Sequence, residues 1–134
     1  MKRTEIKDTG VHVTPICFGT SSLGHMPDTY GYGVSESQAR ETLDAIFESD
    51  VNFIDTSNNY GFGRSEARLG DAIRARGGLP EGMVISTKLD RDMETGRFDA
   101  ARARRSLEES LTRLGVDRVG VLHLHDPEYA ANLD

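Results

Sequence analysis

The chain has 134 residues, of which 37% are hydrophobic and 28% are charged, a balance that suits one soluble globular domain with its own core. Its formal net charge is −6, and because the basic residues are interspersed with acidic ones, no basic stripe is available for a nucleic acid. No apolar run reaches the length of a membrane span, and the first residues lack the apolar core of a secretion signal. The sequence therefore predicts a cytoplasmic protein with neither a membrane nor a nucleic-acid partner.

The first predicted elements are short strands. Residues 3–7 and 11–14 flank a turn sequence at 8–10, which predicts a small β-hairpin at the start of the chain. The apolar run 16–19 predicts a buried strand. It contains Cys17, the one cysteine of the chain, which excludes an internal disulfide. We expect this thiol to be packed rather than nucleophilic, because no base lies beside it in the sequence.

A glycine-rich loop at 20–34 comes next in the chain. Its Tyr30 and Tyr32 are expected to pack the loop onto the scaffold rather than to contact a substrate. Ser35 and Gln38 then fit a capping box, which predicts the start of the first helix. The apolar residues that recur at helical spacing after this cap are Ala39, Leu43, Ile46 and Phe47.

Strands and helices alternate through the rest of the chain. Short apolar strands are predicted at 51–55, 83–87 and 118–124, with amphipathic helices at 66–76 and 99–114 between them. The expected apolar faces of these two helices carry Leu69, Ala72 and Ile73 in the first, and Ala100, Ala103, Leu107, Leu111 and Leu114 in the second. Four apolar strands separated by helices predict parallel pairing with right-handed crossovers, and hence an α/β fold.

Polar residues stand at the ends of three consecutive predicted strands. These residues are Asp55, Lys88 and His125, and Tyr60 follows the first of them by five positions. An open doubly wound sheet places its site at one switch point, whereas an eight-stranded barrel draws functional residues from the C-terminal ends of several strands. The strand ends therefore favour a (β/α)8 TIM barrel over an open sheet.

The length of the chain limits how much of such a barrel it can form. A complete barrel has about 250 residues, so the sequence predicts an N-terminal half. We expect a hairpin at 1–14 and the first four strands with three helices at 15–134. The first and fourth strands of this half would be open edges, and we expect the remaining half-barrel or a second copy to cover them, since a lone monomer should be only marginally stable.

The four polar residues suit proton transfer to a developing alkoxide. A phenol such as Tyr60 loses its proton only at alkaline pH unless the phenolate is stabilised, and Lys88 can provide that stabilisation, because a unit charge at about 4 Å contributes roughly 4 kcal/mol at an effective dielectric near 20. Asp55 would keep the ammonium charged and aimed, and His125 could hydrogen-bond the oxygen of a substrate carbonyl. None of these side chains supplies a hydride, so a reduction needs a cofactor such as a nicotinamide.

The chain resembles the aldo-keto reductase family in motifs spread from the opening hairpin to residue 127. The matching segments are Asp55 to Gly61, Ser65-Glu66, Leu69-Gly70, Ser86 to Lys88, Ser106 to Leu111, Arg113-Leu114, and His125 before Pro127. The resemblance implies a (β/α)8 barrel, NADP or NAD as the cofactor, and a catalytic tetrad of Asp55, Tyr60, Lys88 and His125. Tyr60 would be the general acid in reduction and the base in oxidation, tuned by Lys88 and Asp55. His125 would orient the substrate carbonyl.

The same resemblance implies a place for the cofactor and a class of substrate. It puts Gly19, Thr20 and Asp55 near the nicotinamide. The motifs at 18–24 and 125–127 are similar to the branch that includes aldose, fucose and pyridoxal dehydrogenases, which implies a small carbonyl or sugar-like substrate oxidised at its hemiacetal carbon. The family's main contacts to the nicotinamide amide and to the adenosine phosphate lie on later strands, so we expect the 134-residue chain alone to show no turnover.

Two functions of other kinds compete with this interpretation. His123 and His125 share a strand face, and alternate histidines can hold one ion, as in a metal-dependent TIM-barrel hydrolase. Lys88 and Tyr60 are poor ligands, however, so no metal site is predicted. The other alternative is a non-catalytic half-barrel that dimerises and keeps the tetrad without using it. His123 has no role in the family pattern and is expected to be a hydrogen-bonded interior residue.

Overall fold

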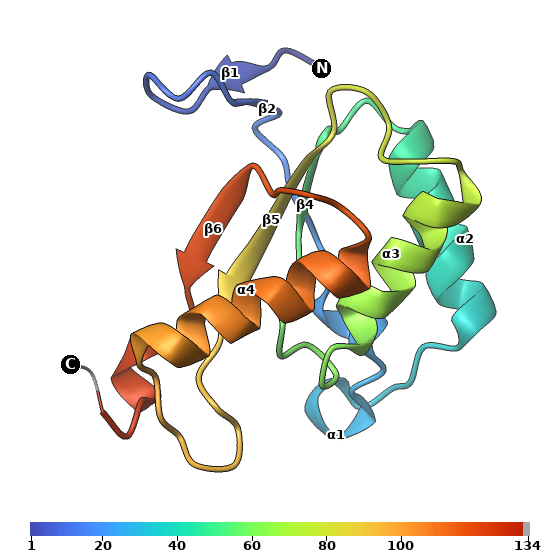
Figure 1. Cartoon of the computed structure of the whole chain (residues 1–134). Helices are drawn as coiled ribbons and strands as arrows, with labels where there is room; N and C mark the ends of the chain where they lie inside the picture. The colour runs from blue at the N-terminus through green and yellow to red at the C-terminus, as the bar shows by residue number, and fades with distance from the viewer. Residues whose placement is uncertain (133–134) are drawn as a thin grey trace.

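The computed structural model describes residues 1–132 as a small hairpin joined to a four-stranded sheet with helices along one side (Figure 1). The strands are β1 (Thr4–Glu5), β2 (His12–Val13), β3 (Phe18–Gly19), β4 (Phe53–Asp55), β5 (Val84–Leu89) and β6 (Val121–Leu124). The helices are η1 (Ser21–Gly24), α1 (Pro27–Tyr30), α2 (Glu36–Glu48), α3 (Arg64–Ala75), α4 (Ala100–Leu114) and η2 (Pro127–Tyr129), of which η1 and η2 are 3₁₀ turns.

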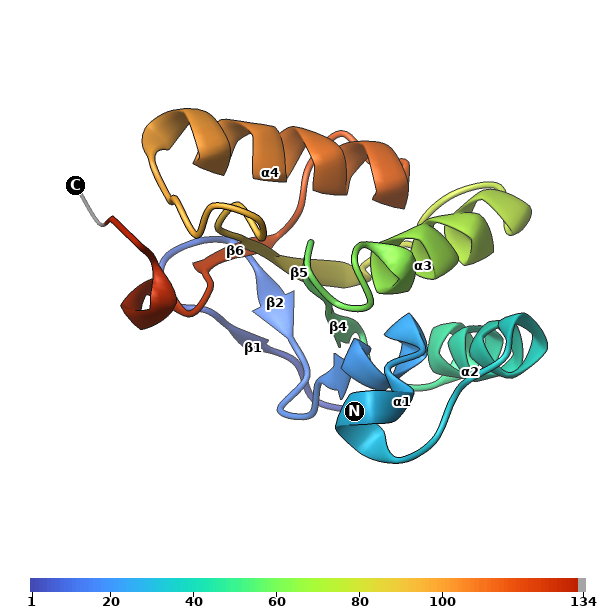
Figure 2. The same ribbon diagram turned by 90° about the horizontal axis from the view of Figure 1, so that it is seen from below.

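The sheet has the order β3-β4-β5-β6, and all of its neighbouring pairs are parallel. Each new strand is therefore added beside the previous one, and the order never reverses as it does at the switch point of a doubly wound sheet. The helices α2, α3 and α4 form an arc along one side of the strands (Figure 2). This arrangement confirms the α/β prediction and is that of a barrel wall with its covering helices.

The core lies between the sheet and these helices. Its fully buried apolar side chains are Leu43 from α2, Ile54 from β4, Leu69 from α3, Ile85 from β5 and Leu114 from α4. The apolar faces predicted for α2 and α3 are confirmed, because all of their named residues are buried. The helices thus hold β4 and β5 from one side, and this fixes where the C-terminal ends of the two strands point.

The capping box predicted for α2 is present. The backbone N–H of Gln38 donates to Ser35 Oγ at 3.2 Å, and the backbone N–H of Ser35 donates to Gln38 Oε1 at 2.9 Å. Two of the N–H groups that a helix leaves without partners at its start are satisfied in this way. The cap sets the point at which the chain leaves the 20–34 segment and begins to cover the sheet.

We expect Ser35→Ala to lower the free energy of unfolding by about 1 kcal/mol, because the substitution removes the side-chain acceptor at the N-cap. Urea denaturation followed by circular dichroism measures this change. Glu41→Ala, at an exposed position within α2, is the matched control and should change stability by less than half as much. Equal effects of the two substitutions would contradict a specific role for the cap.

The prediction for α4 is correct in its extent and wrong in part of its buried face. Ser106, Ser110 and Leu114 are the buried residues of α4, whereas Leu107 is half-buried and Ala100 is exposed. The physical reason is polar packing, because Ser106 Oγ accepts a hydrogen bond of 2.9 Å from a backbone N–H beyond the end of β5. Small polar side chains on this face let α4 approach the strand ends closely.

The edge strands differ from the prediction because each lacks a partner on one side. The run predicted as a strand at 16–19 pairs only at β3, and the strand predicted at 118–124 pairs only at β6. Cys17 is exposed rather than packed, as β3 is at the edge of the sheet. Partial burial of the thiol itself, reinforced by the Asp55 carboxylate, raises the pKa of Cys17 to about 11. The protonated thiol is a poor nucleophile at neutral pH.

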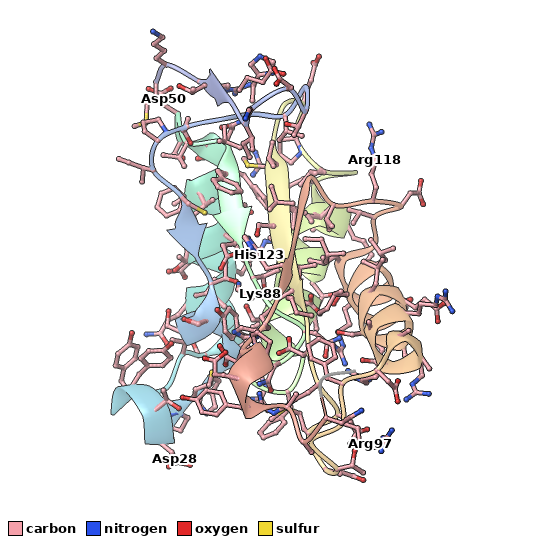
Figure 3. All side chains as sticks on the ribbon, turned by 90° about the vertical axis from the view of Figure 1, so that its left-hand side faces the viewer. Asp28, Asp50, Lys88, Arg97, Arg118 and His123 are labelled. Carbon is pink, nitrogen blue, oxygen red and sulfur yellow. The ribbon has the colours of Figure 1, made fainter. Side chains whose placement is uncertain are left out.

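The face of the sheet away from the long helices is open. His123 pairs in register with Lys88, and Figure 3 shows the two residues beside each other near the middle of the sheet. His123 is exposed, and within residues 1–132 its side chain takes part in no hydrogen bond, so the expectation of a hydrogen-bonded interior residue is wrong. The reason is that β6 is the last strand and nothing in the described chain covers its inner side.

The 20–34 segment contains more regular structure than the glycine-rich loop that the sequence predicts. It forms η1 and α1, and the Tyr30 hydroxyl donates to Ser21 Oγ at 2.6 Å. The rings of Tyr30 and Tyr32 lie 6.0 Å apart. The tyrosines therefore pack against each other and against η1. Across the described part of the chain, no helix combines the length and apolar character needed to pass through a membrane.

Candidate active site

An ion pair joins the ends of β4 and β5. Lys88 Nζ donates to Asp55 Oδ2 at 2.6 Å and to the backbone oxygen of Thr56 at 2.7 Å. The other carboxylate oxygen of Asp55 accepts a hydrogen bond of 2.8 Å from Ser86 Oγ. The side chains of Lys88 and Asp55 are only 13% and 26% exposed. Both charged groups are partly desolvated and are held by hydrogen bonds to defined partners. These bonds fix the position of the ammonium, and its third N–H remains available for another partner.

Tyr60 lies above this ion pair on the loop that follows β4. Lys88 Nζ is 4.9 Å from the centroid of the Tyr60 ring. The imidazole of His125 meets the same ring edge to face, with 5.9 Å between the ring centroids and an interplanar angle of 89°. The structure therefore brings together all four residues of the predicted tetrad, although they are separated by as many as 70 positions in the chain (from 55 to 125).

Close backbone contact fixes the turn that carries Tyr60. Gly61 has a positive φ of 60°, and a Cβ atom placed on it would collide with the backbone of Gly24 in η1. A Cβ on Gly24 would in turn lie 2.8 Å from the Gly61 nitrogen. Only glycine at both positions allows this approach. The turn that presents Tyr60 is thereby held against the segment that follows β3.

Helix α4 holds the same loop from the other side. Asn58 Nδ2 donates to the backbone oxygen of Ser106 at 3.0 Å and to Glu109 Oε2 at 3.1 Å. Arg113 Nη1 donates to the backbone oxygen of Asn58 at 3.2 Å. A hydrogen bond from Arg102 holds the pKa of Glu109 below its usual value. Glu109 is therefore ionised at neutral pH, and this anchor weakens only when the pH falls into the acidic range.

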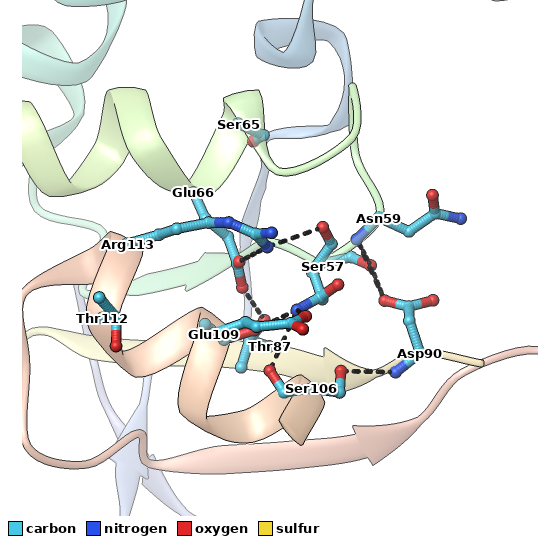
Figure 4. Close-up of polar contacts among 12 residues, drawn as sticks. Ser57, Asn59, Ser65, Glu66, Thr87, Asp90, Ser106, Glu109, Thr112 and Arg113 are labelled. Carbon is cyan, nitrogen blue, oxygen red and sulfur yellow. Dashed lines mark hydrogen bonds and ion pairs between the residues drawn. The ribbon is translucent and has the colours of Figure 1, made fainter. Parts of the chain in front are cut away.

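A buried carboxylate adjoins the loop anchor. Glu66 in α3 is fully buried, accepts a hydrogen bond of 2.7 Å from Thr87 Oγ1 and pairs with Arg113 Nη1 at 3.2 Å. Figure 4 shows Arg113 reaching from α4 to this carboxylate. Arg113 also contacts the loop backbone. Through Glu66 and Arg113, the helices α3 and α4 and the strand β5 are therefore joined to the loop at one point.

His125 is held by a residue that the sequence analysis did not single out. Its Nδ1 lies 2.6 Å from Asp90 Oδ1, and its backbone N–H donates to the oxygen of Leu89 at 3.0 Å. Asp90 is the residue after β5 and is only 1% exposed. The signal that could have found it is its spacing, because Asp90 stands two positions after Lys88 at the same strand end.

The two other predicted cofactor residues are placed differently from each other. Gly19 is exposed at the end of β3, pairs in register with Asp55 and has open space beside its Cα atom. Thr20 is fully buried, and both its backbone N–H and its Oγ1 donate to the backbone oxygen of Asp55, at 2.9 and 3.0 Å. Gly19 therefore presents backbone to the open side, whereas Thr20 supports the strand end that carries Asp55.

The comparison with known protein families gives a direct match. The model of the Aldo/keto reductase family matches residues 15–134 of this chain. The chain belongs to the aldo/keto reductase family.

Individual relatives show how much of an aldo/keto reductase the chain spans. L-galactose dehydrogenase of Arabidopsis thaliana is 38% identical over 92% of this chain and 38% of its own length. The structure of aldo-keto reductase AKR11C1 from Bacillus halodurans is 26% identical, with a TM-score of 0.74 over 97% of this chain and 43% of that one. An aldo-keto reductase from Klebsiella pneumoniae, solved in complex with NADPH, is 28% identical, with a TM-score of 0.64 over 85% of this chain and 36% of that one. The chain thus spans about two fifths of the length of these relatives.

The geometry of this aldo/keto reductase chain gives no support to the metal-dependent alternative. Residues 1–132 contain no group of three or more His, Cys, Asp or Glu side chains placed to share an ion. His123 is the register partner of the cationic Lys88, and Nδ1 of His125 faces Asp90. The two histidines considered as metal ligands therefore face different groups and do not point to one shared ion site.

A large hollow in the described surface lies away from the tetrad. It has a volume of about 1150 Å³ and is lined by hairpin residues together with residues 79–85 and 116–120, at the N-terminal ends of β5 and β6. The tetrad lies at the opposite ends of these strands. In a barrel enzyme the C-terminal ends form the functional face and the N-terminal ends contribute to stability, so the candidate active site lies at the tetrad and not at this hollow.

Proposed function

We propose that this chain carries the proton-transfer residues of an oxidoreductase that moves a hydride between NADP or NAD and a carbonyl or hemiacetal substrate. The single observation that supports the proposal is the gathering of an ammonium, a carboxylate, a phenol and an imidazole at the C-terminal ends of three adjacent strands. Such a set can donate and accept protons at one substrate oxygen. Membership of the aldo/keto reductase family supports the same reaction class.

The donor set fits a nicotinamide cofactor. The four side chains handle protons and charge but none is a redox group, so the hydride has to come from a bound molecule. Gly19 offers a flat, open stretch of backbone beside Asp55, and Thr20 holds that strand end in place. We propose Gly19, Thr20 and Asp55 as the residues of this chain nearest to the cofactor. When bound, the nicotinamide supplies or accepts the hydride.

In the proposed reduction, Tyr60 gives its phenolic proton to the substrate oxygen as negative charge develops there. Lys88 Nζ lies 4.9 Å from the ring centroid, and its positive charge stabilises the resulting phenolate. Asp55 holds the ammonium charged and in place. In the oxidation, the Tyr60 phenolate takes the proton back from the substrate hydroxyl. His125 meets the Tyr60 ring edge to face, and in the proposed reaction it hydrogen-bonds the same substrate oxygen.

We further propose a sugar-like substrate that is oxidised at its hemiacetal carbon. The relative with 38% identity is named L-galactose dehydrogenase, and the exposed Asp126 beside His125 offers an acceptor for a hydroxyl group. The test is to incubate the intact protein with NAD or NADP and a panel of aldoses, aryl alcohols and simple aldehydes, and to follow nicotinamide absorbance. Preferential turnover of aldoses is expected. Turnover of aryl alcohols alone would overturn the sugar assignment, and no turnover with any compound would overturn the reaction class.

We also propose that turnover requires a closed barrel, in which the remaining half-barrel or a second copy covers the open edges. Ile16 beside β3 and Leu122 and Leu124 in β6 are large exposed apolar residues at these edges, and unpaired parallel edges favour association. The 134-residue chain alone is therefore expected to sediment as an assembly larger than 14.8 kDa and to show no NAD(P)H oxidation. Leu124→Glu should weaken this association more than Glu108→Gln on the exposed side of α4. A monomer with full turnover would contradict the proposal.

A further inference from the structure

Asp90 occupies a position that connects His125 to the loop of Tyr60. Its Oδ1 faces His125 Nδ1 at 2.6 Å. Its Oδ2 accepts hydrogen bonds from Ser57 Oγ at 2.7 Å and from the backbone N–H of Asn59 at 3.2 Å. Figure 4 shows Asp90 joined to Asn59 on one side and to Ser106 of α4 on the other. All three of its polar side-chain contacts are thus made to groups that border the proposed active site.

A count of hydrogens determines which nitrogen of His125 is protonated. Ser57 has a single hydroxyl hydrogen, which it donates to Asp90 Oδ2, so Ser57 Oγ offers only a lone pair to His125 Nδ1 at 3.2 Å. The carboxylate of Asp90 is also an acceptor. His125 Nδ1 therefore faces two acceptors, and it must carry the hydrogen that fills the 2.6 Å contact. In the neutral imidazole the other nitrogen, Nε2, then has no hydrogen.

We propose that Asp90 is a positioning residue that holds neutral His125 with its hydrogen on Nδ1, so that Nε2 accepts a hydrogen bond from a substrate hydroxyl while Tyr60 keeps its own proton. The inference rests on the proposed function and assigns the hydroxyl form, an alcohol or a hemiacetal, as the ligand of neutral His125. A carbonyl oxygen needs a donor at Nε2, and only the imidazolium of His125 provides one. Neutral His125 thus binds the reduced, hydroxyl form of the substrate, whereas the imidazolium of His125 binds the oxidised, carbonyl form.

The groups that face the imidazole agree with this assignment. Tyr60 meets the ring edge to face, and the ammonium of Lys88 also contacts the Tyr60 ring. Asp126 Oδ2 is 3.7 Å from Nε2, which is too long for a hydrogen bond, and its side chain is 47% exposed. Asp90 is the one carboxylate in hydrogen-bonding contact with the ring in the described chain. Through Ser57 and Asn59 the same carboxylate also fixes the loop that leads to Tyr60.

The direct test uses nuclear magnetic resonance of the protein labelled with ¹⁵N at its histidine rings. The chain has four histidines, and the signals of His125 are assigned by their loss in His125→Gln. At a pH where His125 is neutral, we expect a protonated, pyrrole-type Nδ1 and an unprotonated, pyridine-type Nε2. The opposite pattern in the unmodified protein would overturn the inference, and apart from His125→Gln for the assignment this measurement needs no variant, cofactor or substrate.

Asp90→Asn should move the hydrogen to Nε2. Ser57 and the Asn59 N–H both donate to the Oδ2 position, so the amide oxygen of the introduced side chain belongs there and its NH₂ group faces Nδ1. Nδ1 must then accept, as in the known effect of replacing the triad aspartate of a serine protease with asparagine. Asp126→Asn is the matched control and should leave the hydrogen on Nδ1. An unchanged His125 in Asp90→Asn would overturn the inference.

The pH dependence of kcat/KM provides a second test, because a purely structural role of Asp90 would leave that dependence unchanged. In the intact enzyme, kcat/KM for carbonyl reduction should be higher at acidic pH than at neutral pH, since the imidazolium is the donor. In Asp90→Asn neutral His125 carries its hydrogen on Nε2, so this rise should disappear. A general loss of activity with an unchanged pH profile would overturn the positioning role. Failure of the oxidoreductase proposal itself would leave the histidine measurement unaffected, so the two outcomes are distinguishable.

Discussion

Replacing Tyr60 with phenylalanine is expected to lower kcat/KM of the intact enzyme by more than about 100-fold, the scale of a positioned proton donor. The substitution removes only the phenolic oxygen and keeps the ring, so the edge-to-face contact with His125 and the packing over Lys88 remain. Steady-state assays in both directions measure the change. Because the ring is retained, the folded structure should be preserved, and circular dichroism checks that it is.

Tyr32→Phe is the matched control for this experiment. Tyr32 is an exposed tyrosine that packs against Tyr30 and lies outside the tetrad, so its loss of a hydroxyl should change kcat/KM by less than about twofold. Turnover of Tyr60→Phe at the rate of the unmodified enzyme would remove the proposed acid from the mechanism. It would leave the family assignment untouched, since that depends on the sequence match.

Replacing Lys88 with methionine is expected to have a similarly large effect. The substitution removes the charge that stabilises the Tyr60 phenolate, an effect of roughly 4 kcal/mol for about 4 Å at a dielectric near 20, before desolvation reduces it. A loss of at least about 100-fold at neutral pH follows. Steady-state assays of oxidation and reduction at neutral pH measure the loss.

The same substitution also leaves the Asp55 carboxylate without its main partner. Removing one member of a buried ion pair can cost about 3–5 kcal/mol, and since Asp55 is 26% exposed we expect about half of that or less. The double variant with Asp55→Asn should regain part of the stability in urea denaturation and none of the activity. Lys7→Met, at an exposed position in the hairpin, controls for the loss of a lysine. Recovery of turnover by the double variant would show that the effect of Lys88 is structural.

The order of elements and the position of the tetrad could be predicted because both follow from local patterns. Alternation along a strand places Asp55 and Lys88 on the same side of neighbouring strands, and parallel pairing brings their ends to one edge. The capping box of α2 and the apolar faces of α2 and α3 involve residues close in sequence. Patterns of this kind need no knowledge of the tertiary structure.

What the sequence could not predict depends on contacts between distant segments. The pairing of Asp90 with His125 joins residues 35 positions apart, so the spacing of Asp90 from Lys88 could mark it as a strand-end residue but could not identify His125 as its partner. The buried face of α4 is set by polar groups such as Ser106 that satisfy backbone beyond β5. The exposure of Cys17 and His123 follows from their places on the two edge strands. A hydrophobicity pattern shows that a strand is apolar but not whether both of its sides have partners.

The unbroken strand order has a consequence for how the protein is made. Since β4, β5 and β6 each dock on the strand synthesised just before it, a chain emerging from the ribosome can fold progressively from its N-terminus. The ionic contact of Asp55 with Lys88 becomes possible once β5 has emerged, while the imidazole arrives only with the last described strand. Assembly of the site is therefore stepwise, and the unpaired edge of each intermediate sheet is open to other chains until the next strand docks on it.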